Sequence, residues 1–156
     1  MAILAICDPR VKDRAMNSTL PETILVDRDG PIATVTINRP EKLNAINTAT
    51  ARGMSDAFDM LSADDDLRVV VLRGAGDRAF GVGADISEFK DRRDDPNQAQ
   101  DYEDSWGPGL ARCRHPVIAL IKGYCIGGSM GLLPETDIRI AGESSTFAIP
   151  AGRLGI

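Results

Sequence analysis

The amino-acid sequence predicts an α/β domain in which strands alternate with helices. Two continuous apolar runs, Val69 to Leu72 and Val117 to Ile121, are too short for helices and suit central strands buried on both faces. Each run leads into a glycine-containing loop. An alternating apolar pattern around Asp29-Gly30 adds a β-hairpin before them.

Composition indicates one globular domain. The 156 residues are 43% hydrophobic and 26% charged, which is enough apolar material for a core. The formal net charge of -5 argues against a nucleic-acid partner, which would need clustered Lys and Arg. No basic amphipathic segment favours a membrane surface, so neither partner is expected.

The cysteine and histidine content indicates no metal site. Cys7, Cys113 and Cys125 form no CxxC pair, and His115 is the single histidine. The opening segment, residues 1–7, is apolar but short and has no basic residue before it, so it fits poorly as a signal peptide or membrane span. We therefore expect reduced thiols in a cytoplasmic protein.

Ordered structure is expected from about Thr23, after a disordered N-terminal extension of residues 1–22, so the core domain spans residues 23–156. The hairpin comes first, because apolar residues alternate with polar ones on both sides of Asp29-Gly30. The alternating residues are Ile24, Val26, Ala33, Val35 and Ile37.

A helix is predicted after the hairpin. Asn47-Thr48 can cap its start, and the acidic run Asp64 to Asp66 marks its exit. Its apolar residues at helical spacing are Met54, Ala57, Phe58 and Leu61.

Four segments are expected between the two buried strands. A Gly-rich loop from Gly74 to Gly83 leads into a short helix from about Asp85. A polar, mobile stretch from Asp91 to Gln98 then precedes a helical segment that ends near Cys113.

The loops after the two strands carry the candidate chemistry. They run from Ala79 to Asp85 and from Gly123 to Gly131, and their glycines let the backbone approach a ligand closely. If a helix begins at the end of each loop, free N–H groups and the positive end of a helix dipole point beyond the strand ends. Two such ends could clamp one oxygen atom. Taken singly, each loop fits close strand-to-helix packing equally well, and neither carries a phosphate-binding fingerprint.

Four segments, in this order, resemble the signatures of the enoyl-CoA hydratase/isomerase, or crotonase, family. They are Arg39 to Ile46, Ala79 to Ile86, His115 to Gly128, and Asp137 to Ala141. The resemblance covers Glu22 to Ile156 and stops where family members continue into further helices. It implies a crotonase-like ββα spiral core that lacks the usual C-terminal helices.

The resemblance also implies an oxyanion hole. The backbone N–H groups of Ala84 and Gly128 would bind the thioester carbonyl oxygen of an acyl-CoA and stabilise an enolate, and such amides are typically worth ~3 to 4 kcal/mol per donor. Coenzyme A is part of the substrate, so no separate cofactor is expected. Asp85 is also a candidate helix cap, and Lys42 could instead be a solvated surface lysine. The implied substrate-binding residues are Lys42, Leu43, Ala45, Gly83, Asp85, Ile86 and Gly127.

Both acids of a hydratase are missing. The family hydrates an enoyl thioester with two glutamates, and the corresponding positions here are Gly131 and Ala151, neither of which can move a proton. Glu135 would lie one turn beyond Gly131 on a continuous helix and is a possible substitute acid or base. Pro134 argues against it, because proline disrupts a helix interior.

The leading hypothesis is an acyl-CoA-processing enzyme of the enoyl-CoA hydratase/isomerase type, a lyase or isomerase that does not use two-glutamate hydration. The alternative is a non-catalytic acyl-CoA-binding or assembly subunit, or an inactive truncated remnant. The end of the chain motivates it, since Arg153 to Ile156 has no helix stop or polar tail and exposed apolar surface is expected there. A nucleotide-phosphate module is a weaker third hypothesis. The resemblance implies a trimer or a pair of trimers, an assembly that truncation would disturb.

Overall fold

The computed structural model describes residues 19–88, 108–150 and 152. The part of the extension up to residue 18 and the stretch Asp91 to Gln98 lie outside these ranges, so their expected disorder and mobility are not tested. Residues 19–22 belong to the folded domain, because Leu20 packs against the core and the Pro21 carbonyl accepts a hydrogen bond from the Ile24 N–H at 2.9 Å.

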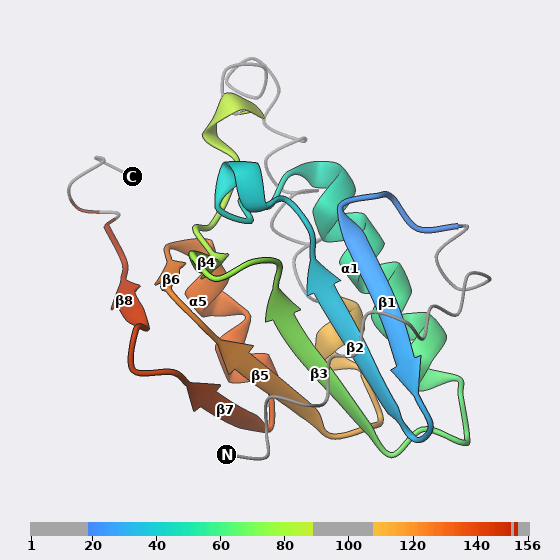
Figure 1. The fold of residues 1–156 in the computed structure, drawn as a ribbon. Helices are drawn as coiled ribbons and strands as arrows, with labels where there is room; N and C mark the ends of the chain where they lie inside the picture. The colour runs from blue at the N-terminus through green and yellow to red at the C-terminus, as the bar shows by residue number, and fades with distance from the viewer. Residues whose placement is uncertain (1–18, 89–107, 151, 153–156) are drawn as a thin grey trace.

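A five-stranded sheet forms the centre of the domain (Figure 1). Its order is β1-β2-β3-β5-β7, with β1 and β2 antiparallel and all later neighbours parallel. The predicted hairpin is confirmed, and Gly30 adopts a φ of +55° in its turn. The prediction that the two apolar runs are central strands is also confirmed. The strands are β1 Ile24–Asp29, β2 Ile32–Ile37, β3 Val69–Gly74, β5 Val117–Ile121 and β7 Ile138–Ala141.

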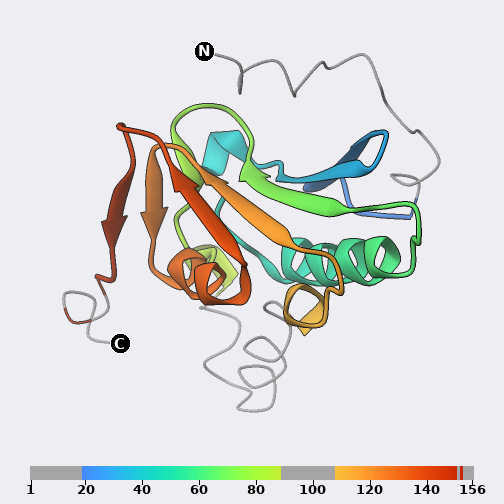
Figure 2. The same ribbon diagram turned by 90° about the horizontal axis from the view of Figure 1, so that it is seen from below.

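The helices cover one face of this sheet (Figure 2). They are α1 (Thr48–Ser62), α4 (Pro108–Ala111) and α5 (Gly128–Gly131). The expected cap of α1 is present, since the Asn47 side chain accepts a hydrogen bond from the Thr50 N–H at 2.9 Å. The helix predicted to end near Cys113 ends slightly earlier, at Ala111.

Burial of β3 and β5 on both faces was expected, and this is wrong for the described residues. Val70, Leu72, Val117 and Ala119 are fully buried, while the residues between them are only partly buried. The reason is the placement of the helices, which pack on a single face and leave the other face of the central strands less covered.

A smaller parallel sheet of order β4-β6-β8 stands beside the first. Its strands are β4 (Ala79–Gly81), β6 (Tyr124–Ile126) and β8 (Thr146–Ala148). The pairs β3-β4, β5-β6 and β7-β8 each send one strand into the large sheet and the next into the small sheet. Because β4 and β6 are parallel neighbours, the loops that follow them emerge side by side. This winding is the ββα spiral that the resemblance implied.

The last two strands expose apolar side chains, whereas Arg153 to Ile156, for which exposed apolar surface was expected, lie outside the described residues. Every residue of β7 and β8 is exposed. The large apolar side chains here are Ile138, Ile140, Phe147 and Ile149, with exposed fractions from 44% to 68%.

Cys113 and Cys125 are free thiols, whereas Cys7 lies outside the described residues. Burial raises the pKa of the Cys125 thiol to about 11, so this thiol stays protonated near neutral pH. In the described ranges no group of three or more His, Cys, Asp or Glu side chains could hold a metal ion, and no helix has the length and apolar character needed to cross a membrane.

Candidate functional site

The loops after β4 and β6 meet through two glycines. Gly83 has a φ of +87°, and a Cβ atom built on it would lie 2.8 Å from the backbone nitrogen of Gly128. Gly127 has a φ of +59° and faces the Gly83 Cα in return. Residues that carry a side chain rarely adopt such φ values, and the close approach leaves no room for a Cβ atom at Gly83.

Ser129 fixes the two loops to each other. Its side chain is completely buried, and its Oγ accepts a hydrogen bond from the Gly83 N–H at 2.9 Å. The second loop is also held from β8, because the Gly127 N–H donates to the Ala148 carbonyl at 2.9 Å. The junction of the loops therefore has a defined geometry.

The N–H group of Ala84 points away from Ile46, the residue that pairs with Ala84. Ile46 pairs with Ala84 in a parallel bridge, in which the Ile46 N–H donates to the Gly83 carbonyl at 2.8 Å and the Asp85 N–H donates to the Ile46 carbonyl at 2.9 Å. The C=O and N–H of a trans peptide point in opposite directions, and no described peptide bond is cis. Since the Gly83 carbonyl faces Ile46, the Ala84 N–H of the same peptide group faces away from it.

The N–H group of Gly128 is directed out of α5 for the same reason. The Gly127 carbonyl accepts a hydrogen bond from the Met130 N–H at 3.0 Å, so the N–H at the other end of that peptide group points back from the helix start. Within the described ranges, neither the Ala84 N–H nor the Gly128 N–H has a hydrogen-bond acceptor. Both donors lie at the junction of the loops, with no acceptor from the described part of the chain.

Short helical segments follow the two loops within the described residues. Ala84 leads into a 3-10 helix, η4 (Ile86–Glu88), and α5 contains a single turn. Few peptide dipoles are aligned in the single turn of α5, so its helix dipole adds little at Gly128. The two N–H groups themselves are the feature of the site.

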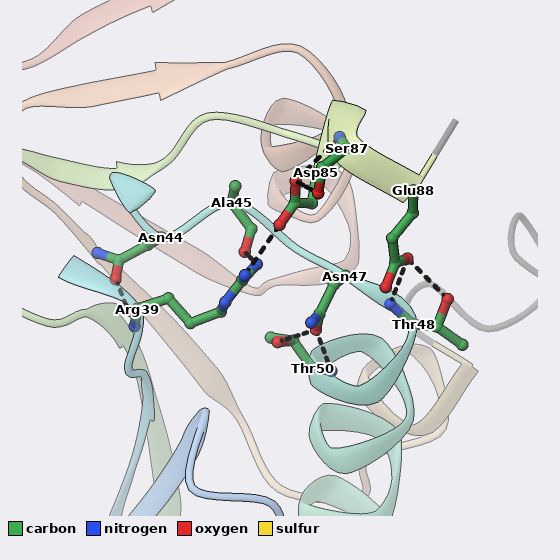
Figure 3. A network of polar contacts seen from close by, with 9 residues as sticks. All are labelled: Arg39, Asn44, Ala45, Asn47, Thr48, Thr50, Asp85, Ser87 and Glu88. Atoms are coloured by element: carbon green, nitrogen blue, oxygen red, sulfur yellow. Dashed lines mark hydrogen bonds and ion pairs between the residues drawn. The ribbon is translucent and has the colours of Figure 1, made fainter. Parts of the chain in front are cut away.

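An ion pair holds the segment after Ala84 (Figure 3). The Arg39 guanidinium donates to the Asp85 carboxylate at 2.8 Å and to the Ala45 carbonyl at 2.7 Å. The other oxygen of Asp85 accepts hydrogen bonds from the Ser87 N–H at 3.1 Å and the Ser87 hydroxyl at 2.6 Å. Asp85 thus caps η4 and pairs with Arg39 at once.

A left-handed turn brings Arg39 to this position. Leu43 and Asn44 have φ values of 52° and 56°, which non-glycine residues rarely adopt. The buried Asn44 side chain stabilises the turn, because it donates to the Ala75 carbonyl at 3.0 Å and to the Ala79 carbonyl at 2.7 Å. The turn is thereby attached to the segment that leads into β4.

Residues 27–156 match the enoyl-CoA hydratase/isomerase family. The chain belongs to this family.

Known members of the family match over about half of their length. The chain is 36% identical over 135 residues to the probable enoyl-CoA hydratase echA8 of Mycobacterium bovis. The matched region covers 86% of this chain and 52% of that protein. It is 34% identical over 144 residues to the carnitinyl-CoA dehydratase of Salmonella arizonae, covering 88% and 52%. The crystal structure of an enoyl-CoA hydratase/carnithine racemase from Magnetospirillum magneticum has a TM-score of 0.83 at 41% identity, covering 87% and 52%.

The substrate-binding residues implied by the enoyl-CoA hydratase/isomerase family lie in two groups. Lys42 is the last residue of η3 (Pro40–Lys42) and is exposed, whereas Leu43 and the buried Ala45 lie in the turn that follows. Gly83, Asp85, Ile86 and Gly127 lie next to the two N–H groups, and Ile86 is 71% exposed. The Ile46–Ala84 bridge brings both groups together, and their roles in binding stay predictions.

The candidate acid Glu135 is not on the same helix as Gly131. α5 ends at Gly131, and Glu135 is an exposed residue of a separate 3-10 helix, η5 (Leu133–Glu135), in which Pro134 occupies the first turn. A Cβ on Gly131 would meet nothing within 4 Å, so the space beside Gly131 is open. Ala151 lies outside the described residues, and the assignment of both residues to the glutamate positions of the family stays a prediction.

Three residues that shape the site were not predicted from the sequence: Arg39, Asn44 and Ser129. Arg39 and Asn44 belong to the Arg39 to Ile46 signature, and Ser129 directly follows Gly128. Their presence in the signature segments was a signal, but their partners become visible only in the fold.

We expect Gly83→Ala to destabilise the domain by about 1 to 3 kcal/mol, because alanine combines a strained φ with a Cβ pressed against Gly128. Urea unfolding measures the free energy. Gly142→Ala is the control, since its Cβ makes only an ordinary 3.7 Å contact with the Ile121 carbonyl, and we expect a change within about 0.5 kcal/mol. Equal effects of the two substitutions would contradict the proposed close approach.

We expect the stabilising effect of Asp85 to depend on pH. The Ser87 hydroxyl, with the Arg39 guanidinium and the Ser87 N–H, holds the pKa of Asp85 below its ordinary value. A pKa lower in the folded state than in the unfolded state contributes stability above the unfolded value, about 3.9, and this contribution is lost as the pH falls through the folded value.

The unfolding free energies of wild type and Asp85→Asn should therefore differ most above about pH 5 and converge as the pH falls through the lowered folded-state pKa of Asp85. Asp77→Asn is the matched control, because its ion pair with Lys122 is exposed and should contribute much less. A difference between wild type and Asp85→Asn that stays constant across this range would show that the Asp85 charge is unimportant.

Proposed function

We propose that the chain binds an acyl-CoA and holds its thioester carbonyl oxygen between the N–H groups of Ala84 and Gly128. The observation that carries this proposal is a pair of N–H donors that have no acceptor in the described part of the chain, at the junction of two loops that contact each other through Gly83. Membership of the enoyl-CoA hydratase/isomerase family supports it.

The chemistry that fits two such donors is enolate stabilisation. When a proton leaves the carbon next to the thioester, or a nucleophile adds to a conjugated double bond, negative charge moves onto the carbonyl oxygen. Amides already fixed by the Ile46 bridge and by Ser129 need no reorganisation to meet that charge. Each donor is expected to contribute ~3 to 4 kcal/mol to this stabilisation.

The residues beside the donors fit the rest of an acyl-CoA. Ile86 offers an exposed apolar side chain two positions from Ala84, which suits the pantetheine chain, and the exposed ammonium of Lys42 suits a phosphate. We assign these contacts to coenzyme A, which would enter as part of the substrate.

Water addition by the usual acids is not part of the proposal. The matched relatives include enzymes named as a hydratase and a dehydratase, yet Gly131 and Ala151 occupy the two glutamate positions here. We therefore propose acyl-CoA binding with carbonyl polarisation, and we leave the proton-transfer group unassigned.

We expect isothermal titration calorimetry to detect butyryl-CoA binding to the wild-type chain, and Gly128→Pro to weaken it by about tenfold, the net contribution of one hydrogen bond to the ground-state carbonyl oxygen. Proline removes the N–H and is tolerated at the first position of a helix, so α5 can still form. Gly128→Ala keeps the donor and is the matched control.

Absence of butyryl-CoA binding by a folded wild-type chain would refute the proposed function. Equal affinities of Gly128→Pro and Gly128→Ala would refute the role of the Gly128 N–H. Competition by ATP but not by acyl-CoA would instead support a nucleotide-phosphate site.

We expect crotonyl-CoA hydration, followed by the loss of enoyl absorbance, to be negligible even where crotonyl-CoA binds. The reason is that no carboxylate occupies position 131 or 151. Turnover that disappears in Glu135→Gln would assign the acid or base role to Glu135 and contradict this expectation. Binding of every tested thioester without turnover would favour a non-catalytic binding subunit.

A further inference from the structure

Arg39 connects the two chain segments that meet at Ala84. Its side chain donates to the carbonyl of Ala45, which precedes Ile46, and to the carboxylate of Asp85, which follows Ala84. The Ile46–Ala84 bridge therefore lies between the two residues that the guanidinium joins (Figure 3). We infer that Arg39 is a positioning residue for the Ala84 N–H group, an inference that rests on the function proposed above.

The orientation of the Ala84 N–H depends on this bridge. The Gly83 carbonyl and the Ala84 N–H belong to one rigid peptide group, and the Ile46 N–H holds the carbonyl end at 2.8 Å. A shift of Ile46 away from Gly83 would rotate the peptide group and turn the donor. Arg39 opposes that shift because it ties the neighbour of Ile46 to the neighbour of Ala84.

The backbone of Arg39 is itself held by hydrogen bonds. The Arg39 N–H donates to the Asn44 side-chain oxygen at 3.0 Å, and the Arg39 carbonyl accepts from the Asn44 N–H at 2.8 Å. The Asn44 amide in turn donates to the Ala75 and Ala79 carbonyls. The backbone of Arg39 therefore belongs to a turn that is hydrogen-bonded to the segment entering β4.

The ion pair is shielded from water. The side chains of Arg39 and Asp85 are only 13% and 10% exposed, so removing one partner leaves the other charge poorly solvated. The two terminal nitrogens of Arg39 are both engaged by acceptors within the domain. This arrangement suits a residue that holds two chain segments together better than a residue that binds a substrate phosphate.

The Gly128 N–H has separate support. Its peptide group is held by the Met130 N–H, and Ser129 ties its loop to Gly83. Within the described ranges, the hydrogen bonds of the Arg39 side chain go to Ala45 and Asp85 and not to α5. Loss of Arg39 should therefore affect one donor of the pair and leave the other in place, whereas general destabilisation would affect both.

Hydrogen exchange followed by NMR tests this selectivity without a ligand. In Arg39→Met we expect the Ile46 and Asp85 amides, whose hydrogen bonds form the bridge, to exchange about tenfold faster, while the Met130 amide is unchanged. Asp85→Asn, which is nearly isosteric, should give the same pattern, and Arg39→Lys should restore part of the protection. Arg112→Met, which breaks the exposed ion pair with Asp59, is the control and should change none of these amides.

The second readout is the carbonyl stretching frequency of bound butyryl-CoA labelled with ¹³C at the thioester carbon. Hydrogen bonds to the oxygen lower this frequency, so we expect a smaller lowering in Arg39→Met than in wild type, and no change in Arg112→Met. Unchanged exchange at Ile46 and Asp85, uniform acceleration across the domain, or an unchanged carbonyl frequency would overturn the positioning role. Absence of butyryl-CoA binding by the wild type would refute the proposed function, and the exchange pattern would still decide whether Arg39 secures the bridge.

Discussion

The close approach of Gly83 to the backbone of Gly128 is the constraint on which the candidate site depends. Parallel pairing of β4 with β6 places the two loops side by side, but only a glycine lets them touch, because any Cβ at Gly83 would lie 2.8 Å from the Gly128 nitrogen. The buried Ser129 hydroxyl then fixes the contact. Both backbone donors lie at this junction, while the Ile46 bridge and the Met130 hydrogen bond set their directions.

The sequence predicted the parts of the fold that depend on local pattern. The hairpin at Gly30 and the Asn47 cap are confirmed because alternation and capping act over a few residues. The one-sided cover of β3 and β5 was missed, since it depends on where distant helices pack. The Arg39–Asp85 pair joins residues 46 positions apart, so only the folded chain reveals it.

The candidate site was predictable to a similar extent. Glycine-rich segments and the family signatures located Ala84 and Gly128, yet the direction of their N–H groups follows from the Ile46 bridge and the Met130 hydrogen bond. The expected helix dipole at Gly128 contributes little, because α5 has one turn. The described structure therefore supports the two backbone donors as a candidate site, but it identifies no group for proton transfer.

Convergence of the two donors on one oxygen is the central claim, and an amide NMR titration tests it directly. As butyryl-CoA is added to ¹⁵N-labelled protein, the account predicts that the Ala84 and Gly128 amide protons shift downfield together and saturate at the same ligand concentration. Free coenzyme A, which has no thioester carbonyl, should not produce these shifts. Movement of only one of the two resonances, or the same shifts with free coenzyme A, would contradict a shared carbonyl site.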